Sequence, residues 1–312
     1  MDDLLLAFDF GGTKLTAALT RLSHSVPGQQ GWLDVRRVFS PEGGDAQFDM
    51  ETMIKLGAEI LAGRQATAVG VSFGGLVDYE TGTVRLSHHV PGWENIPLQA
   101  LLAAEFSAPI RIDNDANVAA LGEHRFGAGQ GHDSLMYITV STGVGGGWVL
   151  SGKPWRGHAG MAGEIGHTVV DPSGPLCLCG KRGCVERLAS GPYMAQDWAE
   201  EQGSGGAREL ATGKDVAEMA AKGDEAARRI LLRGARALGV GIGNAANLIN
   251  PQLFVLGGGV TKSGDLWWDA VRQSAHETAL PEVHFEIVPA SLGDDAPLWG
   301  AIALLMAEGL IG

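Results

Sequence analysis

The chain places one histidine and its only three cysteines close together: His167, Cys177, Cys179 and Cys184. Thiolates and imidazoles are the ligands that Zn²⁺ prefers, and one histidine with three cysteines matches a closed tetrahedral site. Free thiols are the alternative, whereas an odd number of bunched cysteines makes a poor disulfide framework. Four protein ligands leave no open position for water, so the spacing predicts a structural zinc site.

A second group of reactive residues follows an apolar run near the start of the chain. Asp9 precedes a glycine turn made by Gly11, Gly12, Thr13 and Lys14. Backbone N–H groups and a lysine suit phosphate oxygens, and a carboxylate can hold the hydration shell of Mg²⁺. A capping role for Asp9 and a solvated Lys14 are the alternative. The turn predicts binding of a nucleotide phosphate with Mg²⁺.

A second glycine turn resembles the first. The segments 4–19 and 135–150 both read as strand, glycine turn and strand, which is the pattern of a β-hairpin. Two unrelated hairpins are the alternative to a duplicated domain whose two hairpin tips grip one phosphate chain. We expect the second tip to bind phosphate through Thr142, Gly143, Gly145 and Gly146.

Two carboxylates and two amides lie together between a predicted strand and a predicted helix. They are Asp113, Asn114, Asp115 and Asn117. Any one of them could simply cap the helix, but four exceed what capping needs. Ligands of α/β proteins bind at the carboxyl ends of strands. An aspartate there could accept the proton of a hydroxyl nucleophile in phosphoryl transfer.

The elements that must position these residues alternate between strand and helix, which predicts largely parallel sheets in two layered domains. Common nucleotide fingerprints fail: no GxGxxG opens a helix, and Pro154 occupies the Ser/Thr position of a Walker-like spacing at Gly147 and Gly152. We expect helices over 52–61, 118–126, 226–248 and 298–310, strands over 68–73, 110–113 and 253–256, and a polar surface loop over 200–214.

Composition restricts the function classes. The chain has 312 residues, 45% hydrophobic and 19% charged, which is typical of a folded soluble protein and not of a disordered one. Its net charge of −13 disfavours binding to nucleic acid over a broad face. The apolar run at the start is too short for a signal peptide or a membrane span, so we expect a cytoplasmic protein without a membrane partner.

These residues, in this order, resemble the ROK family (repressor, open reading frame, kinase) of sugar kinases and regulators. The resemblance covers the whole chain and rests on FDFGGTK, the quartet 114–117, STGVGGG, and AGEIGH followed by CLCGKRGCVE. It implies an α/β, two-domain, actin-like (ribonuclease H-like) ATPase fold with duplicated hairpin phosphate loops. We expect a smaller domain over 1–118 and 296–312, and a larger domain over 119–295 that holds the zinc site.

The resemblance also implies roles for individual residues. Asp115 matches the catalytic base of the family, and Gly257 and Gly258 match its adenosine-side segment. The implied protein is an ATP-dependent kinase acting on a hexose hydroxyl, with O6 of glucose as the expected acceptor, and it forms a homodimer. The implied sugar contacts are Gly75, Asn114, Asp115, Glu164, His167 and Glu186.

Two departures from the family pattern leave the identity of the sugar open. Gly74 stands where the family often has proline, and His89 replaces an asparagine that its glucokinases often carry. A kinase for an N-acetylhexosamine or another hexose is therefore the main alternative. A DNA-binding regulator is disfavoured because the first hairpin begins at Leu4 and the net charge is acidic. An idle sugar-binding protein is disfavoured by the intact Asp115.

Overall fold

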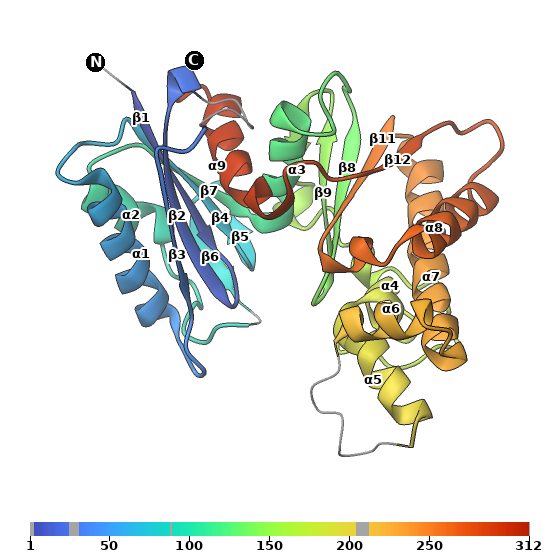
Figure 1. The fold of residues 1–312 in the computed structure, drawn as a ribbon. Helices are drawn as coiled ribbons and strands as arrows, with labels where there is room; N and C mark the ends of the chain where they lie inside the picture. The colour runs from blue at the N-terminus through green and yellow to red at the C-terminus, as the bar shows by residue number, and fades with distance from the viewer. Residues whose placement is uncertain (1–2, 25–30, 88, 204–211, 312) are drawn as a thin grey trace. The chain divides into compact units, whose positions relative to one another are not determined.

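The structure, a computed structural model, describes residues 3–24, 31–87, 89–203 and 212–311. The chain divides into two compact units, the first made of residues 1–131, 147–162 and 291–312, and the second of residues 132–146 and 163–290 (Figure 1). The sequence-based domain boundaries place residues 119–131, 147–162 and 291–295 in the second domain instead. In the structure, residues 119–126 belong to a helix that packs within the first unit.

The first unit is built on a five-stranded sheet with the order β3-β2-β1-β4-β7. Strand β1 pairs antiparallel with β2 and parallel with β4, and β4 pairs parallel with β7. The carboxyl ends of β1, β4 and β7 therefore lie at one edge, where α/β proteins bind ligands. The strands are β1 (Leu4–Phe10), β2 (Lys14–Arg21), β3 (Asp34–Phe39), β4 (Ala68–Phe73) and β7 (Ile110–Asn114).

Alternation along β1 directs its side chains to two different helical layers. Leu4, Leu6, Phe8 and Phe10 join the apolar core beneath helices α1 (Ala46–Leu61) and α2 (Leu98–Phe106). The intervening residues, including Asp9, point to the opposite face because successive side chains of a strand alternate. A short hairpin of β5 (Leu76–Asp78) and β6 (Thr83–Leu86) completes this part of the unit.

Helix α9 (Ala296–Ala307) packs on this opposite face of the sheet at very short backbone distances. A Cβ atom at Gly70 of β4 would lie 2.1 Å from the carbonyl oxygen of Ala301. One at Gly300 would lie 1.9 Å from the carbonyl oxygen of Val118 in helix α3 (Asp115–Phe126). Glycine is therefore required where α9 meets both the sheet and α3.

The second sheet repeats the strand order of the first, as the predicted duplication requires. Its order is β10-β9-β8-β11-β12, and β11 pairs parallel with both β8 and β12. The boundary between the two units falls inside β9, after Gly146. The strands are β8 (Leu135–Val140), β9 (Val144–Leu150), β10 (Lys153–Trp155), β11 (Leu253–Gly257) and β12 (Glu286–Pro289).

Helices of the second unit gather around one long helix, α7 (Glu225–Ile249). The side chain of Asp224 caps its first turn, and Asn250 ends it in a left-handed conformation at φ 53°. Gly239 and Gly243 bring it close to α8, since a Cβ atom at either would lie 2.6 Å from α8. The other helices are α4 (Val185–Ala189), α5 (Gly191–Glu201), α6 (Gly213–Ala221) and α8 (Asp265–Thr278).

The predicted elements are present, with shifted ends. Helix α1 begins at Ala46 and not at Thr52 because Asp45 accepts the N–H of Phe48 and caps it. Helix α9 covers 296–307 instead of 298–310. Much of the predicted loop over 200–214 falls outside the described residues, since 204–211 are not described. Among the described helices, none combines the length and apolar character needed to cross a membrane.

Candidate active site and metal centre

The first unit aligns three polar side chains across its parallel strands. Asp9 pairs in register with Ser72, and Ser72 pairs with Asp113, so all three lie at the carboxyl edge on one face. The hydroxyl of Ser72 donates to Oδ1 of Asp9 at 3.2 Å. Burial and, to a smaller extent, the negative charge of Asp115 raise the pKa of Asp9 from its ordinary value of 3.8 to about 7.

Asp115 starts helix α3 directly after β7. Its Oδ1 accepts the backbone N–H of Ala116 at 2.8 Å. A Cβ atom placed on Gly74 would lie 3.8 Å from Oδ2 of Asp115 and 3.8 Å from the backbone nitrogen of Gly12. The carboxylate of Asp115 and the first hairpin tip therefore both lie near the point that Gly74 leaves free of a side chain. Burial raises the pKa of Asp115, which makes this carboxylate a better proton acceptor toward an alcohol.

Asn114 has a structural role in addition to any contact with a ligand. Its Oδ1 accepts the N–H groups of Ala116 at 2.9 Å and Asn117 at 3.4 Å, so it caps α3. Its Nδ2 donates to the carbonyl oxygen of Gly75 at 2.9 Å. The asparagine thus ties the predicted backbone contact at Gly75 to the start of α3, the helix that begins with Asp115. A sugar contact through either residue stays a prediction.

The tip of the first hairpin has the compact backbone that a phosphate site needs. The N–H of Gly11 donates to the carbonyl oxygen of Lys14 at 3.1 Å, and a Cβ atom at Gly11 would lie 2.8 Å from that oxygen. Thr13 is exposed. Gly12 packs against His89, since a Cβ atom added to Gly12 would lie 3.0 Å from the Cβ of His89. The positive charge of Lys14 lowers the pKa of Asp9, although burial outweighs it.

The second hairpin tip is held by Glu186, which the sequence predicts only as a sugar contact. Oε2 of Glu186 accepts the backbone N–H of Val144 at 2.9 Å, and it lies 2.8 Å from where a Cβ of Gly143 would be. The N–H of Ser141 donates to the carbonyl oxygen of Gly143 at 2.9 Å and closes the turn. Thr142 is exposed at the tip.

Glycines around this tip allow close backbone packing. A Cβ atom at Gly146 would lie 2.8 Å from the carbonyl oxygen of Gly163. The preceding residue, Gly145, is half-buried on β9. At the end of β11, Gly258 has φ 90° and a Cβ there would lie 2.4 Å from the carbonyl oxygen of Val140. Gly257 is equally restricted, because its Cβ would lie 2.4 Å from the hydroxyl oxygen of Tyr137.

The four predicted metal ligands come together in the second unit. One ligand atom from each of His167, Cys177, Cys179 and Cys184 lies within 4.8 Å of the others, and the Sγ atoms of Cys179 and Cys184 are 3.5 Å apart. Ligand sulfurs of a tetrahedral zinc site are about 3.8 Å apart at Zn–S distances of about 2.3 Å. Nδ1 of His167 is buried and has no hydrogen-bond partner among the residues that the structure describes. These residues fit a zinc ion.

The thiols of this cluster differ in acidity. Burial raises the pKa of Cys177 and raises that of Cys184 to about 12. A backbone hydrogen bond from Lys181 lowers the pKa of the exposed Cys179. A metal must displace protons from the two buried thiols, so occupancy of the site rises with pH. Glu164, at the start of the 3₁₀ turn that carries His167, is exposed.

The structure adds Arg156, which no motif in the sequence indicates. Its Nε lies 2.6 Å from Oδ2 of Asp113, and its guanidinium carbon lies 3.4 Å over the ring of Tyr79. Burial raises the pKa of Asp113, and the charge of Arg156 opposes that shift. Asp113 therefore serves as an anchor of the strand end, leaving Asp115 as the carboxylate of this segment available for proton transfer.

Known proteins are similar to this chain over most of its length. The model of the ROK family matches residues 5–308. The chain is similar to the glucokinase of Thermotoga maritima (34% identical over 79% of this chain and 81% of that protein) and to that of Streptomyces coelicolor (32% identical over 96% and 97%). The crystal structure of a ROK family glucokinase from Streptomyces griseus, in complex with glucose and AMPPNP, aligns with a TM-score of 0.80 at 32% identity, covering 98% of this chain and 99% of that one.

Proposed function

The chain belongs to the ROK family, and we propose that it is an ATP-dependent kinase that phosphorylates O6 of glucose. The observation that carries this proposal is the carboxylate of Asp115, which has a raised pKa and lies, like the amide nitrogen of Gly12 at the first hairpin tip, 3.8 Å from the position of a Cβ atom on Gly74. A proton acceptor next to a phosphate-binding turn is the arrangement that phosphoryl transfer to an alcohol requires.

In the proposed reaction, the sugar hydroxyl attacks the γ-phosphorus of ATP. A bond forms between O6 and phosphorus, the bond from the γ-phosphorus to the bridging oxygen breaks, and ADP leaves with that electron pair. Asp115 accepts the hydroxyl proton. General-base catalysis of this kind contributes about 10²–10⁴-fold to the rate.

The residues around Asp9 fit a magnesium ion that enters with ATP. Asp9, which is buried, and Asp115, which is half-buried, form an acidic pair whose mutual repulsion a cation would relieve. When bound, Mg²⁺ neutralises charge on the β- and γ-phosphate oxygens. Asp9 would hold its hydration shell. Gly11, Gly12 and Thr13 would bind phosphate oxygens through the backbone.

The second unit is proposed to contribute further contacts. Thr142, Gly143, Gly145 and Gly146 would bind phosphate, and Gly257 and Gly258 would lie on the adenosine side. Glu164, His167 and Glu186 would bind sugar hydroxyls. His167 and the three cysteines would hold zinc, which would link the cysteine loop to the turn that carries His167. If Nδ1 of His167 were the ligand atom, Nε2 would carry the hydrogen and could only donate.

The experiment that tests the base is Asp115→Asn in a coupled assay for ADP, with glucose binding measured separately by calorimetry. We expect a loss of kcat of about 10²–10⁴-fold with glucose binding retained. Asp3→Asn, an exposed change at the other end of β1, is the matched control and should retain wild-type turnover. Near-wild-type turnover of Asp115→Asn would rule out the assignment.

A kinase for an N-acetylhexosamine is the second candidate, and it rests on the departure from the glucokinase pattern at His89. His89 stands at the first hairpin tip, within Coulombic reach of Asp115. A single pocket contact can decide between sugars that differ by one group. A panel of hexoses and N-acetylhexosamines, scored as kcat/KM with ATP and Mg²⁺, separates the two candidates, since the true substrate should exceed the others by at least tenfold.

The remaining properties have direct tests. We propose one zinc ion per chain, and less than about half an equivalent in freshly purified protein would contradict it. We also propose a homodimer, which light scattering after size-exclusion chromatography would detect as twice the chain mass of 32.6 kDa. A cytoplasmic location is the proposal that agrees with three reduced cysteines in a metal cluster.

A further inference from the structure

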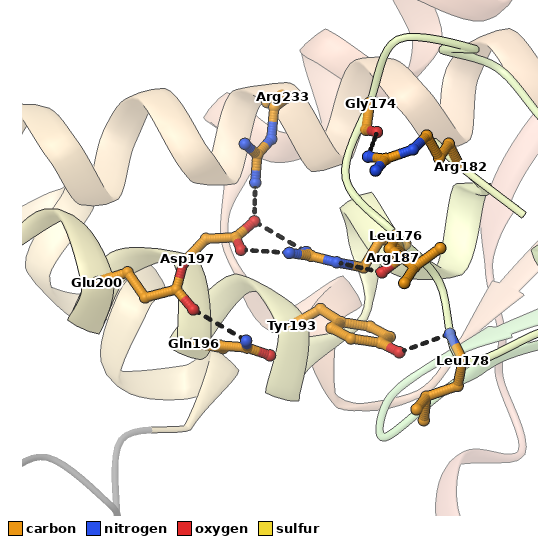
Figure 2. Close-up of polar contacts among 10 residues, drawn as sticks. All are labelled: Gly174, Leu176, Leu178, Arg182, Arg187, Tyr193, Gln196, Asp197, Glu200 and Arg233. Carbon is orange, nitrogen blue, oxygen red and sulfur yellow. Dashed lines mark hydrogen bonds and ion pairs between the residues drawn. The ribbon is translucent and has the colours of Figure 1, made fainter. Parts of the chain in front are cut away.

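Arg187 connects the cysteine loop to two helices of the second unit. It lies on α4, and its Nε donates to the carbonyl oxygen of Leu176 at 3.2 Å. Nη1 and Nη2 donate to the two carboxylate oxygens of Asp197 on α5, at 3.0 and 2.7 Å (Figure 2). Both side chains are buried, at 8% and 10% exposure. The guanidinium therefore uses three of its donors in fixed directions.

Tyr193 of α5 completes this connection from the other side of Cys177. Its hydroxyl oxygen accepts the backbone N–H of Leu178 at 3.2 Å, and the guanidinium carbon of Arg187 lies 4.6 Å from its ring centroid. Leu176 and Leu178 are the two neighbours of Cys177 in the chain. Each neighbour of Cys177 in the chain thus makes one backbone hydrogen bond to a side chain of this group, as Figure 2 shows for Leu176 and Leu178.

Asp197 balances the charge of this group. It is bonded by Arg187 and also by Arg233 of α7, so one carboxylate holds two guanidinium groups (Figure 2). Buried ion pairs contribute little net stability, because desolvation of the charges offsets their attraction. Their geometry is specific, however, because a bidentate arginine fixes direction as well as distance. We therefore expect these side chains to fix the positions of neighbouring residues more than to raise the free energy of unfolding.

Helix α4 joins this group to the second hairpin tip. The helix follows Cys184 directly, and its residue Glu186 binds the N–H of Val144 while the next residue, Arg187, binds Asp197. Within residues 184–187, Cys184 is therefore a predicted metal ligand, Glu186 holds the second hairpin tip, and Arg187 binds the buried carboxylate of Asp197. A shift of Arg187 would move Cys177 through Leu176 without changing any ligand.

We propose that one group of side chains positions Cys177 for zinc and slows the release of the metal. We name this group the Arg187 clamp, and it consists of Arg187, Tyr193, Asp197 and Arg233. Arg187 is a positioning residue, since it touches neither the ligand atoms nor a substrate. This inference rests on the proposed zinc ion and not on the kinase reaction. Orienting partners of metal ligands change metal affinity by about 10–100-fold when they are removed.

The test measures zinc release from the zinc-loaded full chain into a chromogenic chelator. Arg187→Lys keeps the charge but loses the bidentate contact, and we expect release to accelerate about tenfold. Arg182→Lys is the matched control, because Arg182 also donates to a loop carbonyl, that of Gly174, at 3.2 Å, but not beside a cysteine (Figure 2). Release from this control should stay within twofold of wild type.

Tyr193→Phe provides a second variant that preserves the fold, because it removes one hydroxyl and leaves Arg187 in place. We expect a several-fold faster release, together with an altered thiolate-to-cobalt absorption band when Co²⁺ replaces zinc. A residue that only stabilises the fold would leave that band unchanged.

Two outcomes would overturn the inference. They are equal release rates for Arg187→Lys and Arg182→Lys, and a cobalt spectrum of Tyr193→Phe identical to wild type. Zinc missing from the wild-type protein would instead contradict the proposed metal site, and neither result depends on kinase activity.

Discussion

Asp9→Asn offers a test in which the ligand-free protein should become more stable while losing activity. Burial and the charge of Asp115 raise the pKa of Asp9 to about 7, from 3.8. The folded state therefore disfavours the ionised form. The shift of about three units corresponds to about 4 kcal/mol at 1.36 kcal/mol per unit. Asparagine avoids this cost, and its Oδ1 can still accept the hydroxyl of Ser72.

The pH dependence has a definite sign. Between about pH 4 and pH 7, the unfolded state has lost the proton of Asp9 while the folded state keeps it. Stability of the wild-type protein therefore falls as pH rises through this window, and the full cost is present above pH 7. The gain from Asp9→Asn should approach about 4 kcal/mol at pH 8 and shrink toward zero near pH 4.

Urea unfolding followed by tryptophan fluorescence, without sugar, nucleotide or divalent cation, measures this gain. Asp3→Asn, an exposed change directly before β1, should alter stability by less than about 0.5 kcal/mol at any pH. Mg²⁺ with a nucleotide should stabilise the wild type more than the variant and narrow the difference. A variant that is less stable than wild type at pH 8, or a gain independent of pH, would refute the reasoning.

Three further changes test other parts of the two units. Glu186→Ala should lower kcat/KM for ATP by about 10–100-fold, because a charged hydrogen bond to Val144 is worth about 1.5–3 kcal/mol, whereas Glu186→Gln should retain most activity. His89→Asn should change the ratio of kcat/KM between glucose and N-acetylglucosamine by at least tenfold, and an unchanged ratio would remove His89 from the pocket. Gly258→Ala should lower the unfolding free energy by about 2 kcal/mol more than Gly264→Ala, because both glycines have positive φ but only Gly258 meets a carbonyl oxygen, at 2.4 Å.

Much of the architecture could be predicted from the sequence, because the signals are local. The hairpin of β1 and β2 is visible as two apolar runs joined by a glycine turn, and the same pattern marks β8 and β9. The long helix over 226–248 was expected one residue short at each end, since Asp224 and Asn250 are the caps. Helix ends elsewhere were harder to predict, as at Asp45, because capping depends on side-chain geometry.

Some residues of the candidate site could likewise be predicted from the sequence, whereas the partners of others became known only from the structure. The cysteines and histidine that meet within 4.8 Å were all identified from residue type and spacing, because few other arrangements use three thiols in one short loop. Asp115 was identified together with Asn114, but only the structure assigned Asn114 to the cap of α3 and Asp113 to Arg156. Neighbouring aspartates cannot be told apart in a sequence, because their roles depend on which residues contact them in the fold.

By itself, the sequence determined the chemical groups that this protein has and the turns that carry them: a carboxylate after β7, two glycine hairpins and a set of four residues that could hold a metal ion. The tertiary structure alone decided which distant residues meet. Asp9 bonds Ser72 across 63 positions, Arg156 bonds Asp113 across 43, and Glu186 bonds Val144 across 42. Such pairs depend on strand register and on which helix faces a given edge, and no local pattern records either one.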